Sequence, residues 1–405
     1  MATYLSSIGH QVHAITGFPY YPQWKIQAEY RHSWFSSELI NGVNISRCPL
    51  YIPQKPTGLK RIIQDFTFLI TSGIVLSGFI LKRKKFDTIF TVSPSFLNGL
   101  TALWYKMFFP RTKIVYHLQD LQIDAAKDLG IIKNKLLLNQ LDDIEDFILK
   151  RVDIVSTITK GMQQKILTKK ATPKKTIVFP NWTTIHPQNI SQINLTILKE
   201  LNIPQDKKII FYAGAIGEKQ GLDILLDLAE LTFKNLPEVY FLIAGAGPYT
   251  EKLKAITKKR MINNIQFIEI QPTEIYITLL QYATINLVIQ RRAASDLVMP
   301  SKLSSILGAG GLALVTAEAA SSLHQLIAEN EIGIAVDPEN LRLIYNAIER
   351  VVISTNSEMN SFGQVQDVNI IDVKRLRENA FQYAQNHLSK EALIADFMKQ
   401  VQELN

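Results

Sequence analysis

Short, nearly continuous apolar runs alternate along the chain with longer segments of helical periodicity. Continuous apolar runs are typical of parallel strands that are buried on both faces of a sheet. Helical spacing of apolar residues predicts helices between them, for example over 222–233, 249–258 and 273–282. This alternation predicts an α/β protein whose parallel sheets carry helices on both faces. The runs predicted to be strands are 12–16, 88–92, 113–117, 154–157, 176–179, 208–212, 240–244, 265–270, 285–289, 312–315 and 333–336.

The 405 residues exceed what one hydrophobic core usually serves, so we expect two doubly wound domains. A polar stretch over 184–204 predicts the break between them. We assign residues 1–190 to the first domain and 191–375 to the second, and expect 376–405 to form helices that pack across both. An opening helix over 2–9 stands before the first predicted strand, whereas such domains begin with a strand. We therefore expect the first sheet to lack its central opening strand.

Composition narrows the class of protein. Apolar residues make up 47% and charged residues 20%, as in globular proteins. The net charge of +8 suits anionic partners, which include nucleotides, phospholipid and nucleic acid, and it does not choose among them. Cys48 is the one cysteine, which excludes an intrachain disulfide and a cysteine-based metal site. The first residues lack the pattern of a signal peptide, so we expect a cytoplasmic protein. We expect no nucleic acid among its partners.

Residues 66–81 form a charge-free run that the basic residues Lys82, Arg83, Lys84 and Lys85 follow. The run is shorter than the roughly 20 apolar residues of a membrane-spanning helix. A buried helix of an α/β domain is the interpretation that we favour. A helix that lies on anionic lipid at the inner face of the plasma membrane is an alternative, and a true span is a third.

The segment 293–310 combines a carboxylate, Asp296, with the turn Pro300-Ser301-Lys302 and the start of an apolar helix. Proline is favoured at the first helical position, and the helix dipole attracts an anion there. A lysine in that turn is unfavourable unless an anion lies beside it. The pattern thus indicates a seat for a nucleotide diphosphate, the alternative being an ordinary junction with a solvated lysine.

Two glycine-bearing loops follow predicted strands. The first holds Gly214, Gly217, Lys219 and Gln220 after the strand at 208–212, where glycines allow backbone to approach a phosphate. The second, Gly245-Ala-Gly247, begins like a dinucleotide fingerprint but has Thr250 at the third glycine position. A plain turn is the alternative for the first loop, and a nicotinamide-dependent oxidoreductase is an alternative for the second.

Several further residues are placed to line a ligand site. His117 ends a predicted strand with Asp120 close behind, and it could hold a substrate hydroxyl or be a structural histidine satisfied by the fold. Asn181 follows another strand. Tyr21 and Trp24 belong to an aromatic cluster that suits sugar or lipid contacts, or a packed loop. No Asp-x-Asp sequence is present, so we expect no metal bridging a diphosphate.

Seven sequence segments, quoted at the end of this paragraph, together resemble the retaining GT-B glycosyltransferases of family 4. Within that family the resemblance is to the WcaI-like branch of colanic acid biosynthesis. The segments follow the family's order along nearly the whole chain. The phrases that carry the resemblance are GHQVHAITGFPYYPQW, CPLYIPQKPTGLKR, HLQDLQIDAAKDLG, VSTITKGM, FPNW, GAIGEKQGLD and SDLVMPSKL.

The resemblance implies two Rossmann-like doubly wound parallel-sheet domains with a cleft between them, the first binding an acceptor and the second a UDP- or GDP-sugar. It implies transfer of a sugar to a lipid-linked or polysaccharide acceptor with retention of configuration, and no metal or other cofactor. His117 and Asp296 are the implied catalytic residues. The implied donor-binding residues are Gly214, Gly217, Lys219, Gln220, Gly245, Gly247, Arg291, Pro300, Ser301 and Lys302, and the acceptor side comprises Tyr21, Trp24, Asp120 and Asn181.

The chain departs from the family pattern at specific positions. Ala215 and Gln220 stand where many members carry an arginine and a lysine, so the diphosphate depends on Lys219, Lys302 or the pair Arg291 and Arg292. Ser305 replaces a ribose-binding glutamate. These departures and the missing strand leave two alternatives open, an impaired relative that only binds nucleotide-sugar and an epimerase that needs no acceptor.

Overall fold

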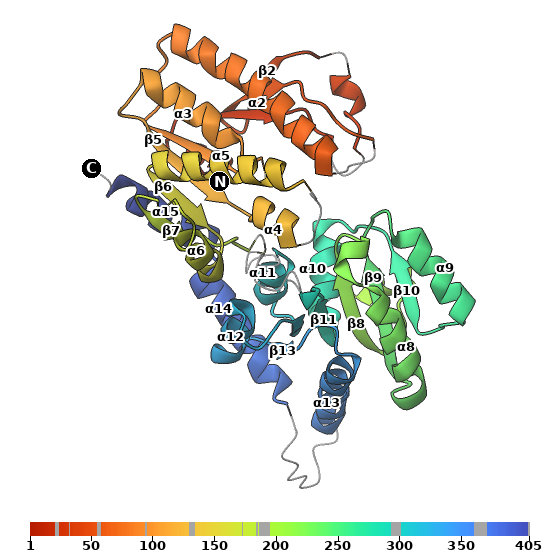
Figure 1. Ribbon diagram of the computed structural model, residues 1–405. Helices are drawn as coiled ribbons and strands as arrows, with labels where there is room; N and C mark the ends of the chain where they lie inside the picture. The colour runs from red at the N-terminus through yellow and green to blue at the C-terminus, as the bar shows by residue number, and fades with distance from the viewer. Residues whose placement is uncertain are drawn as a thin grey trace. The chain divides into compact units, whose positions relative to one another are not determined.

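The computed structural model of the chain describes residues 1–20, 24–31, 33–54, 58–93, 95–128, 134–171, 173–183, 185, 195–292, 301–359 and 371–403. The chain forms two compact units (Figure 1). The first comprises Met1–Phe179 and Phe397–Asn405, and the second comprises Pro180–Asp396. The boundary thus falls before the polar stretch at 184–204. Helix α14 (Val373–His387) lies in the second unit, whereas the end of α15 (Lys390–Gln402) belongs to the first.

The first unit contains two sheets. The parallel sheet has the order β4-β5-β6-β7, and the smaller mixed sheet has the order β1-β3-β2. Among the described strands, β1 pairs only with β3 and β4 only with β5, so the single first sheet expected from the sequence is divided. The strands are β1 (His13–Gly17), β2 (Ser36–Ile40), β3 (Val43–Cys48), β4 (Thr88–Val92), β5 (Lys113–Leu118), β6 (Ile154–Thr157) and β7 (Thr176–Val178).

Helices cover these sheets. Phe397 of α15 stacks on Phe179 with the ring centroids 4.2 Å apart, and Lys113 Nζ donates to the carbonyl of Val401 at 3.2 Å. These contacts hold the end of the chain against the four-stranded sheet. The other helices of the unit are α1 (Ala2–Ser7), α2 (Gly58–Leu81), α3 (Asn98–Phe108), α4 (Gln122–Asp128), α5 (Lys135–Arg151) and α6 (Lys160–Leu167).

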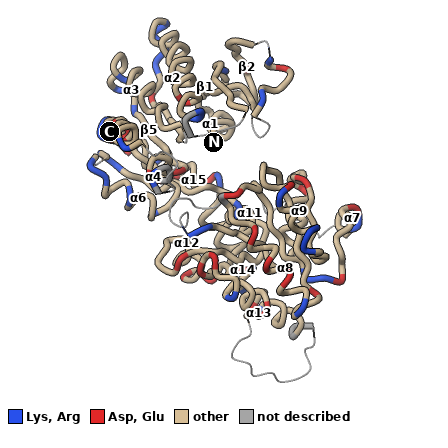
Figure 2. Tube along the Cα trace, turned by 45° about the vertical axis from the view of Figure 1, so that its right-hand side comes forward, with Lys and Arg blue, Asp and Glu red and all other residues tan. Residues whose placement is uncertain are grey.

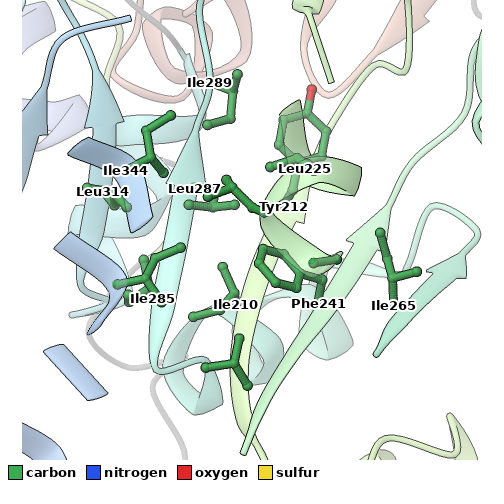
Figure 3. Close-up of a cluster of buried hydrophobic side chains, with 14 of the residues drawn as sticks. Ile210, Tyr212, Leu225, Phe241, Ile265, Ile285, Leu287, Ile289, Leu314 and Ile344 are labelled. Carbon is green, nitrogen blue, oxygen red and sulfur yellow. The ribbon is translucent and has the colours of Figure 1, made fainter. Parts of the chain in front are cut away.

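The second unit is built on one parallel sheet in the order β10-β9-β8-β11-β12-β13. The apolar runs expected to be its strands are all present, because both faces of each central strand are buried. Figure 3 shows part of this core, with Tyr212, Phe241 and Leu287 among its side chains. The strands are β8 (Lys208–Ala213), β9 (Val239–Ala244), β10 (Ile265–Ile268), β11 (Ile285–Val288), β12 (Ala313–Thr316) and β13 (Ile334–Val336).

Helices bury both faces of this sheet. Side chains from α8, α9 and α13 belong to the core on one face, and side chains from α10, α11, α12 and α14 belong to the core on the other. The strand order reverses between β8 and β11, which is where ligands bind in open α/β sheets. Besides α14, the helices of this unit are α7 (Leu195–Glu200), α8 (Asp223–Asn235), α9 (Thr250–Arg260), α10 (Thr273–Tyr282), α11 (Ser301–Gly308), α12 (Ser322–Glu329) and α13 (Leu341–Met359).

The sequence interpretation of the apolar run at 66–81 was wrong. The apolar helix α2 is not a buried helix, since only 17% of its most apolar window lies inside the protein. The acidic run Asp142–Asp146 on α5 is only partly exposed, because Glu145 is buried and lies 2.5 Å from Lys169 Nζ. Asp124 also reaches Lys169, at 2.8 Å. The partly buried ammonium of Lys169 therefore compensates two carboxylates from different helices.

Candidate functional site

The glycine loops after β8 and β9 pack directly on each other. The Gly214 amide donates to Ala244 O at 2.9 Å, and the Ile216 amide donates to Ala246 O at 3.0 Å. Gly245 has a φ of +158°, and an added Cβ there would lie 1.9 Å from Gly214 O. An added Cβ at Gly247 would likewise lie 2.1 Å from Ile216 O. These two glycines are therefore required for loop packing, and their contact with a nucleoside stays a prediction.

Lys302, in the first turn of α11, reaches back to the end of β8. Its Nζ lies 3.9 Å from the centroid of the Tyr212 ring, a cation–π contact. An added Cβ at Gly214 would lie 2.5 Å from this Nζ, and Gly214 has a φ of +147°. Glycine at this position thus gives the ammonium its place at the strand end. Tyr212 is held in turn by a hydrogen bond from its hydroxyl to Ala215 O at 2.9 Å.

The electrostatics of Lys302 are unusual for a lysine. Burial lowers the pKa of its ammonium to about 8, because desolvation disfavours the charged form. No acidic side chain forms an ion pair with Lys302 in the part of the chain that the structure describes. A partly desolvated cation without a carboxylate, at the crevice end of a parallel sheet, is suited to an anionic ligand.

The two arginines that follow β11 have separate contacts. Arg291 donates from Nη2 to Glu218 O at 3.0 Å, which ties the end of β11 to the loop that contains Gly217. Arg292 forms ion pairs with Glu318 and Asp337. Because two carboxylates already neutralise Arg292, the structure favours Arg291 over Arg292 as a further phosphate contact.

The remaining donor-side predictions are distributed around Lys302. Ser301 is exposed at the start of α11, and Gln220 has a buried Oε1 that no described donor reaches. Lys219 lies in a short 3₁₀ turn (Glu218–Gln220), which places its backbone beside Gly217. Asp296 and Pro300 lie outside the described residues. The structure therefore brings the Gly214–Gln220 loop, Arg291 and Lys302 to one edge of the second sheet.

His117, at the end of β5 in the first unit, is enclosed by its own fold. The Gln119 amide Nε2 lies 2.7 Å from His117 Nε2 and must donate to it, which leaves Nδ1–H to donate to Ser156 Oγ at 2.9 Å. Phe90 stacks on the ring, with centroids 5.4 Å apart. Burial lowers the pKa of His117 to about 4, so the ring is neutral at pH 7. These contacts fit a structural histidine, and a role beside the transferred sugar stays a prediction.

A pair of carboxyl groups lies at the crevice end of the first unit's parallel sheet. Asp120 follows β5, and Ser93, which follows β4, donates from Oγ to Asp120 Oδ1 at 3.5 Å. Asp65 of α2 lies close enough to Asp120 for the two carboxylates to repel each other. Burial raises the pKa of Asp65 to about 6, and Asp120 adds to the rise. Sequence reasoning missed Asp65, although it is the single charged residue between Arg61 and Lys82.

The other acceptor-side predictions are only partly described. Trp24 has a φ of +53°. Its ring contacts the Tyr20 ring, with the centroids 5.6 Å apart, and the Arg61 guanidinium lies 5.4 Å from the Trp24 ring centroid. These contacts fit the packed loop that the sequence left open. Tyr21 lies outside the described residues. Asn181 belongs to the second unit and is partly buried.

Comparisons with known proteins match both units. A family described as "Glycosyl transferase 4-like domain" matches residues 1–182, and one described as "Glycosyl transferases group 1" matches residues 194–364. The putative colanic acid biosynthesis glycosyl transferase WcaI of Escherichia coli K12 is 35% identical over 361 residues, which is 87% of each chain. The chain belongs to the WcaI-like glycosyltransferases of family 4. It is therefore a glycosyltransferase of the hexosyltransferase type.

Solved structures agree on the fold of this WcaI-like chain. Sucrose-phosphate synthase from Thermosynechococcus elongatus has a TM-score of 0.73 at 15% identity, covering 100% of this chain and 91% of the other. HepE from Anabaena, solved in complex with UDP-glucose, has a TM-score of 0.66 at 11% identity and covers 98% of this chain and 100% of the other. The fold is GT-B, with two Rossmann-like parallel-sheet units, as the sequence predicted.

Proposed function

We propose that this WcaI-like chain transfers a sugar from a UDP- or GDP-sugar to a hydroxyl of a lipid-linked or polysaccharide acceptor, with retention of configuration and without a metal. A nucleotide-sugar donor is supported by the UDP-glucose in the HepE crystal structure. A polysaccharide-pathway acceptor is supported by the name of the E. coli relative, which places that protein in colanic acid biosynthesis.

The observation that carries the proposal is the position of Lys302. Its ammonium lies at the end of β8, beside Gly214 and over the Tyr212 ring, without an ion-pair partner in the described chain. A diphosphate at this edge would supply the missing negative charge. It would also lie at the N-terminus of α11, where the helix dipole is positive. The site thus matches the charged part of a nucleotide-sugar.

The ammonium of Lys302 would also stabilise the transition state of sugar transfer. Transfer forms a bond from the acceptor oxygen to the anomeric carbon and breaks the bond from that carbon to the diphosphate. The electron pair and negative charge remain on the diphosphate, which also takes the acceptor proton in a same-face reaction. A fixed cation beside the departing oxygen stabilises the transition state more than the ground state. Lys302 is the residue that would supply this stabilisation.

Metal independence rests on the chemistry of the donor set. Within the described ranges, no three His, Cys, Asp or Glu side chains lie together as metal ligands. The proposal gives the charge-neutralising function to the ammonium of Lys302, which lies over the Tyr212 ring at the end of β8. Full transfer activity in the presence of EDTA is expected, and activity that returns only on adding Mg²⁺ or Mn²⁺ would overturn this part of the proposal.

On the acceptor side, the proposal assigns the carboxyl pair Asp65 and Asp120 to the acceptor hydroxyl. Carboxylate oxygens accept hydrogen bonds from sugar hydroxyl groups. The two groups differ in environment, since Asp65 is partly desolvated and Asp120 already accepts from Ser93.

Donor binding is tested first by thermal unfolding with UDP, GDP, their sugar conjugates and NAD. A ligand at 100 times its Kd stabilises the folded state by about 2.7 kcal/mol. We expect stabilisation by one nucleotide series and none by NAD. Stabilisation by NAD alone would overturn the donor assignment. With the donor known, product formed without acceptor would indicate an epimerase, and the anomeric configuration of a transfer product, read by NMR, tests retention.

A further inference from the structure

Helix α2 has an apolar stripe that faces away from its own sheet. Ile63, Phe66, Ile70, Ile74 and Leu81 follow one another at helical spacing, and all five side chains are exposed. Asp65 is the only charged residue of α2 after Arg61, so Figure 2 shows most of the helix without charge. An exposed apolar stripe of this length is an interaction surface rather than ordinary surface.

Helix α3 extends this surface. Trp104 Nε1 donates to Ser77 Oγ of α2 at 3.3 Å, which joins the two helices side by side. Met107 and Phe108 are exposed next to Trp104, and the Trp104 and Phe108 rings lie 5.2 Å apart. An open apolar groove runs between the helices, and it is lined by Leu69, Ile70, Gly73, Ser77, Leu100, Thr101 and Trp104.

Basic residues border the same surface at the ends of both helices. Lys82, Arg83 and Lys85 follow α2, and Arg111 follows α3. The two ends are held together, since Thr112 Oγ1 donates to Phe86 O at 2.8 Å and Tyr105 Oη donates to Lys84 O at 2.6 Å. All four basic side chains are exposed, and none forms an ion pair with a described carboxylate. Apolar side chains with a basic border match an anionic lipid surface.

The opposite face of α2 packs against the rest of the first unit. Gln64, Ser72 and Leu76 are buried, and Thr71 Oγ1 donates to Pro49 O at 2.8 Å. The Tyr51 amide donates to Thr67 Oγ1 at 2.9 Å. The 22-residue segment Lys60–Leu81 is long and apolar enough to cross a membrane, but these contacts hold its other face against the first unit. It therefore suits a position along a membrane surface rather than across it.

We propose that the exposed faces of α2 and α3, with the basic residues at their ends, dock the protein onto the surface of an anionic phospholipid bilayer. The apolar stripe enters the boundary between headgroups and acyl chains, and Lys82, Arg83, Lys85 and Arg111 contact lipid phosphates. This inference rests on the first unit alone and does not depend on the proposed donor or acceptor. Its test therefore needs no substrate.

The test is cosedimentation of the full chain with vesicles of phosphatidylcholine containing 30% phosphatidylglycerol, in about 0.1 M salt. We expect binding that weakens at least tenfold in pure phosphatidylcholine vesicles or at 0.5 M salt, where charge screening is nearly complete. The double substitution Ile70→Glu with Ile74→Glu should weaken binding at least tenfold. Both side chains are exposed, so circular dichroism and melting temperature should be unchanged.

A matched control uses Ile270, which is 64% exposed in the second unit, against 61% for Ile70. Ile270→Glu should leave vesicle binding unchanged. The triple substitution of Lys82, Arg83 and Lys85 by glutamate should abolish the preference for phosphatidylglycerol, whereas Lys258→Glu with Lys259→Glu on α9 should not. No binding to either vesicle, or equal effects of Ile70 and Ile270 variants, would overturn the proposal. A dimer that dissociates in the Ile70 and Ile74 variant, without vesicle binding, would assign the surface to a second copy and overturn it too.

Discussion

The ammonium of Lys302 lies 3.9 Å from the centre of the Tyr212 ring, which joins the first turn of α11 to the end of β8. The ring face is a weak substitute for a counter-charge, and burial lowers the pKa of the ammonium to about 8. The ligand-free protein thus retains a cation that is costly to bury. An anion that binds there would recover this cost, which links the stability of the second unit to its proposed ligand.

Replacement of Lys302 by methionine should separate stability from donor binding. Methionine fills similar volume over Tyr212 without the desolvated charge, so we expect the ligand-free protein to gain about 1–3 kcal/mol of unfolding free energy at pH 7. Loss of a charge-assisted contact with phosphate should weaken donor binding about 10- to 100-fold. Urea unfolding and titration calorimetry measure the two effects. Lys258→Met, on the exposed end of α9, is the control, and equal donor affinity in all three proteins would contradict the assignment.

The lowered pKa of Lys302 also predicts a pH dependence. The folded value of about 8 lies below the ordinary 10.5, so the unfolded chain binds more protons between these values. Stability of the ligand-free protein should therefore carry a contribution that rises with pH from about 8 to 10.5. Affinity for a nucleotide-sugar should fall about tenfold per pH unit above 8, as the ammonium loses its proton. Calorimetry from pH 7 to 9.5 measures this, and a slope that Lys302→Met retains would assign it to another group.

Gly245 tests the packing of the two glycine loops. In Gly245→Ala, the added Cβ would lie 1.9 Å from Gly214 O, and the backbone must shift. We expect a loss of about 2–3 kcal/mol of stability and weaker donor binding, because the Gly214 loop moves away from Lys302. Gly78→Ala is the control, since no atom lies within 4 Å of its added Cβ on α2. That variant should gain up to about 1 kcal/mol from helix propensity. Similar melting temperatures for the two variants would contradict the packing argument.

The sequence predicted the parallel strands well because burial on both faces leaves a continuous apolar run. It missed the hairpin β2–β3, in which exposed and buried residues alternate and polar side chains are frequent. A signal was present, since Asn41-Gly42 is a strong hairpin turn and both residues have positive φ, at 49° and 77°. The exposure of α2 could not be read from its composition, because an apolar helix looks the same in a core and at a surface.

The part of the candidate site that could be predicted is the part encoded by one short sequence pattern. Pro300-Ser301-Lys302 indicated an anion seat, and the structure places Lys302 at a strand end. Its partner Tyr212 lies far away in the sequence, so the cation–π contact could not be predicted. Arg291 and Arg292 are neighbours that the sequence could not distinguish. The structure separates them, because only Arg292 meets the carboxylates of Glu318 and Asp337.

Asp65 gives a prediction for the acceptor side. Burial raises its pKa to about 6 from 3.8, so the ionised carboxylate costs stability as the pH rises from about 4 to 6. Asp65→Asn should therefore be about 2 kcal/mol more stable than the native protein at pH 8 and equally stable near pH 3.5. Under the proposed function, the native kcat/KM for acceptor should rise with pH through about 6, and the variant should lose that rise. A variant with native kinetics at every pH would remove Asp65 from the acceptor site.

The buried ion pair of Glu145 and Lys169 gives a prediction about stability alone. Lys169 Nζ lies 2.5 Å from Glu145 and 2.8 Å from Asp124, and Glu145 is buried on α5. Burial raises the pKa of Glu145, which offsets part of the gain from the ion pair, and Lys169 keeps Asp124 as a partner. Glu145→Gln should therefore cost about 1–2 kcal/mol. Asp142→Asn on the same helix is the matched control. It breaks the more exposed pair with Lys127 and should cost less than about 1 kcal/mol.

Urea unfolding at pH 7.5 measures both variants. Because Glu145 belongs to the first unit and Lys302 to the second, donor affinity should be native in the folded fraction of Glu145→Gln. Equal costs for the two substitutions would mean that burial does not govern the strength of these ion pairs. A Glu145→Gln variant as stable as the native protein would show that Asp124 alone compensates the ammonium of Lys169.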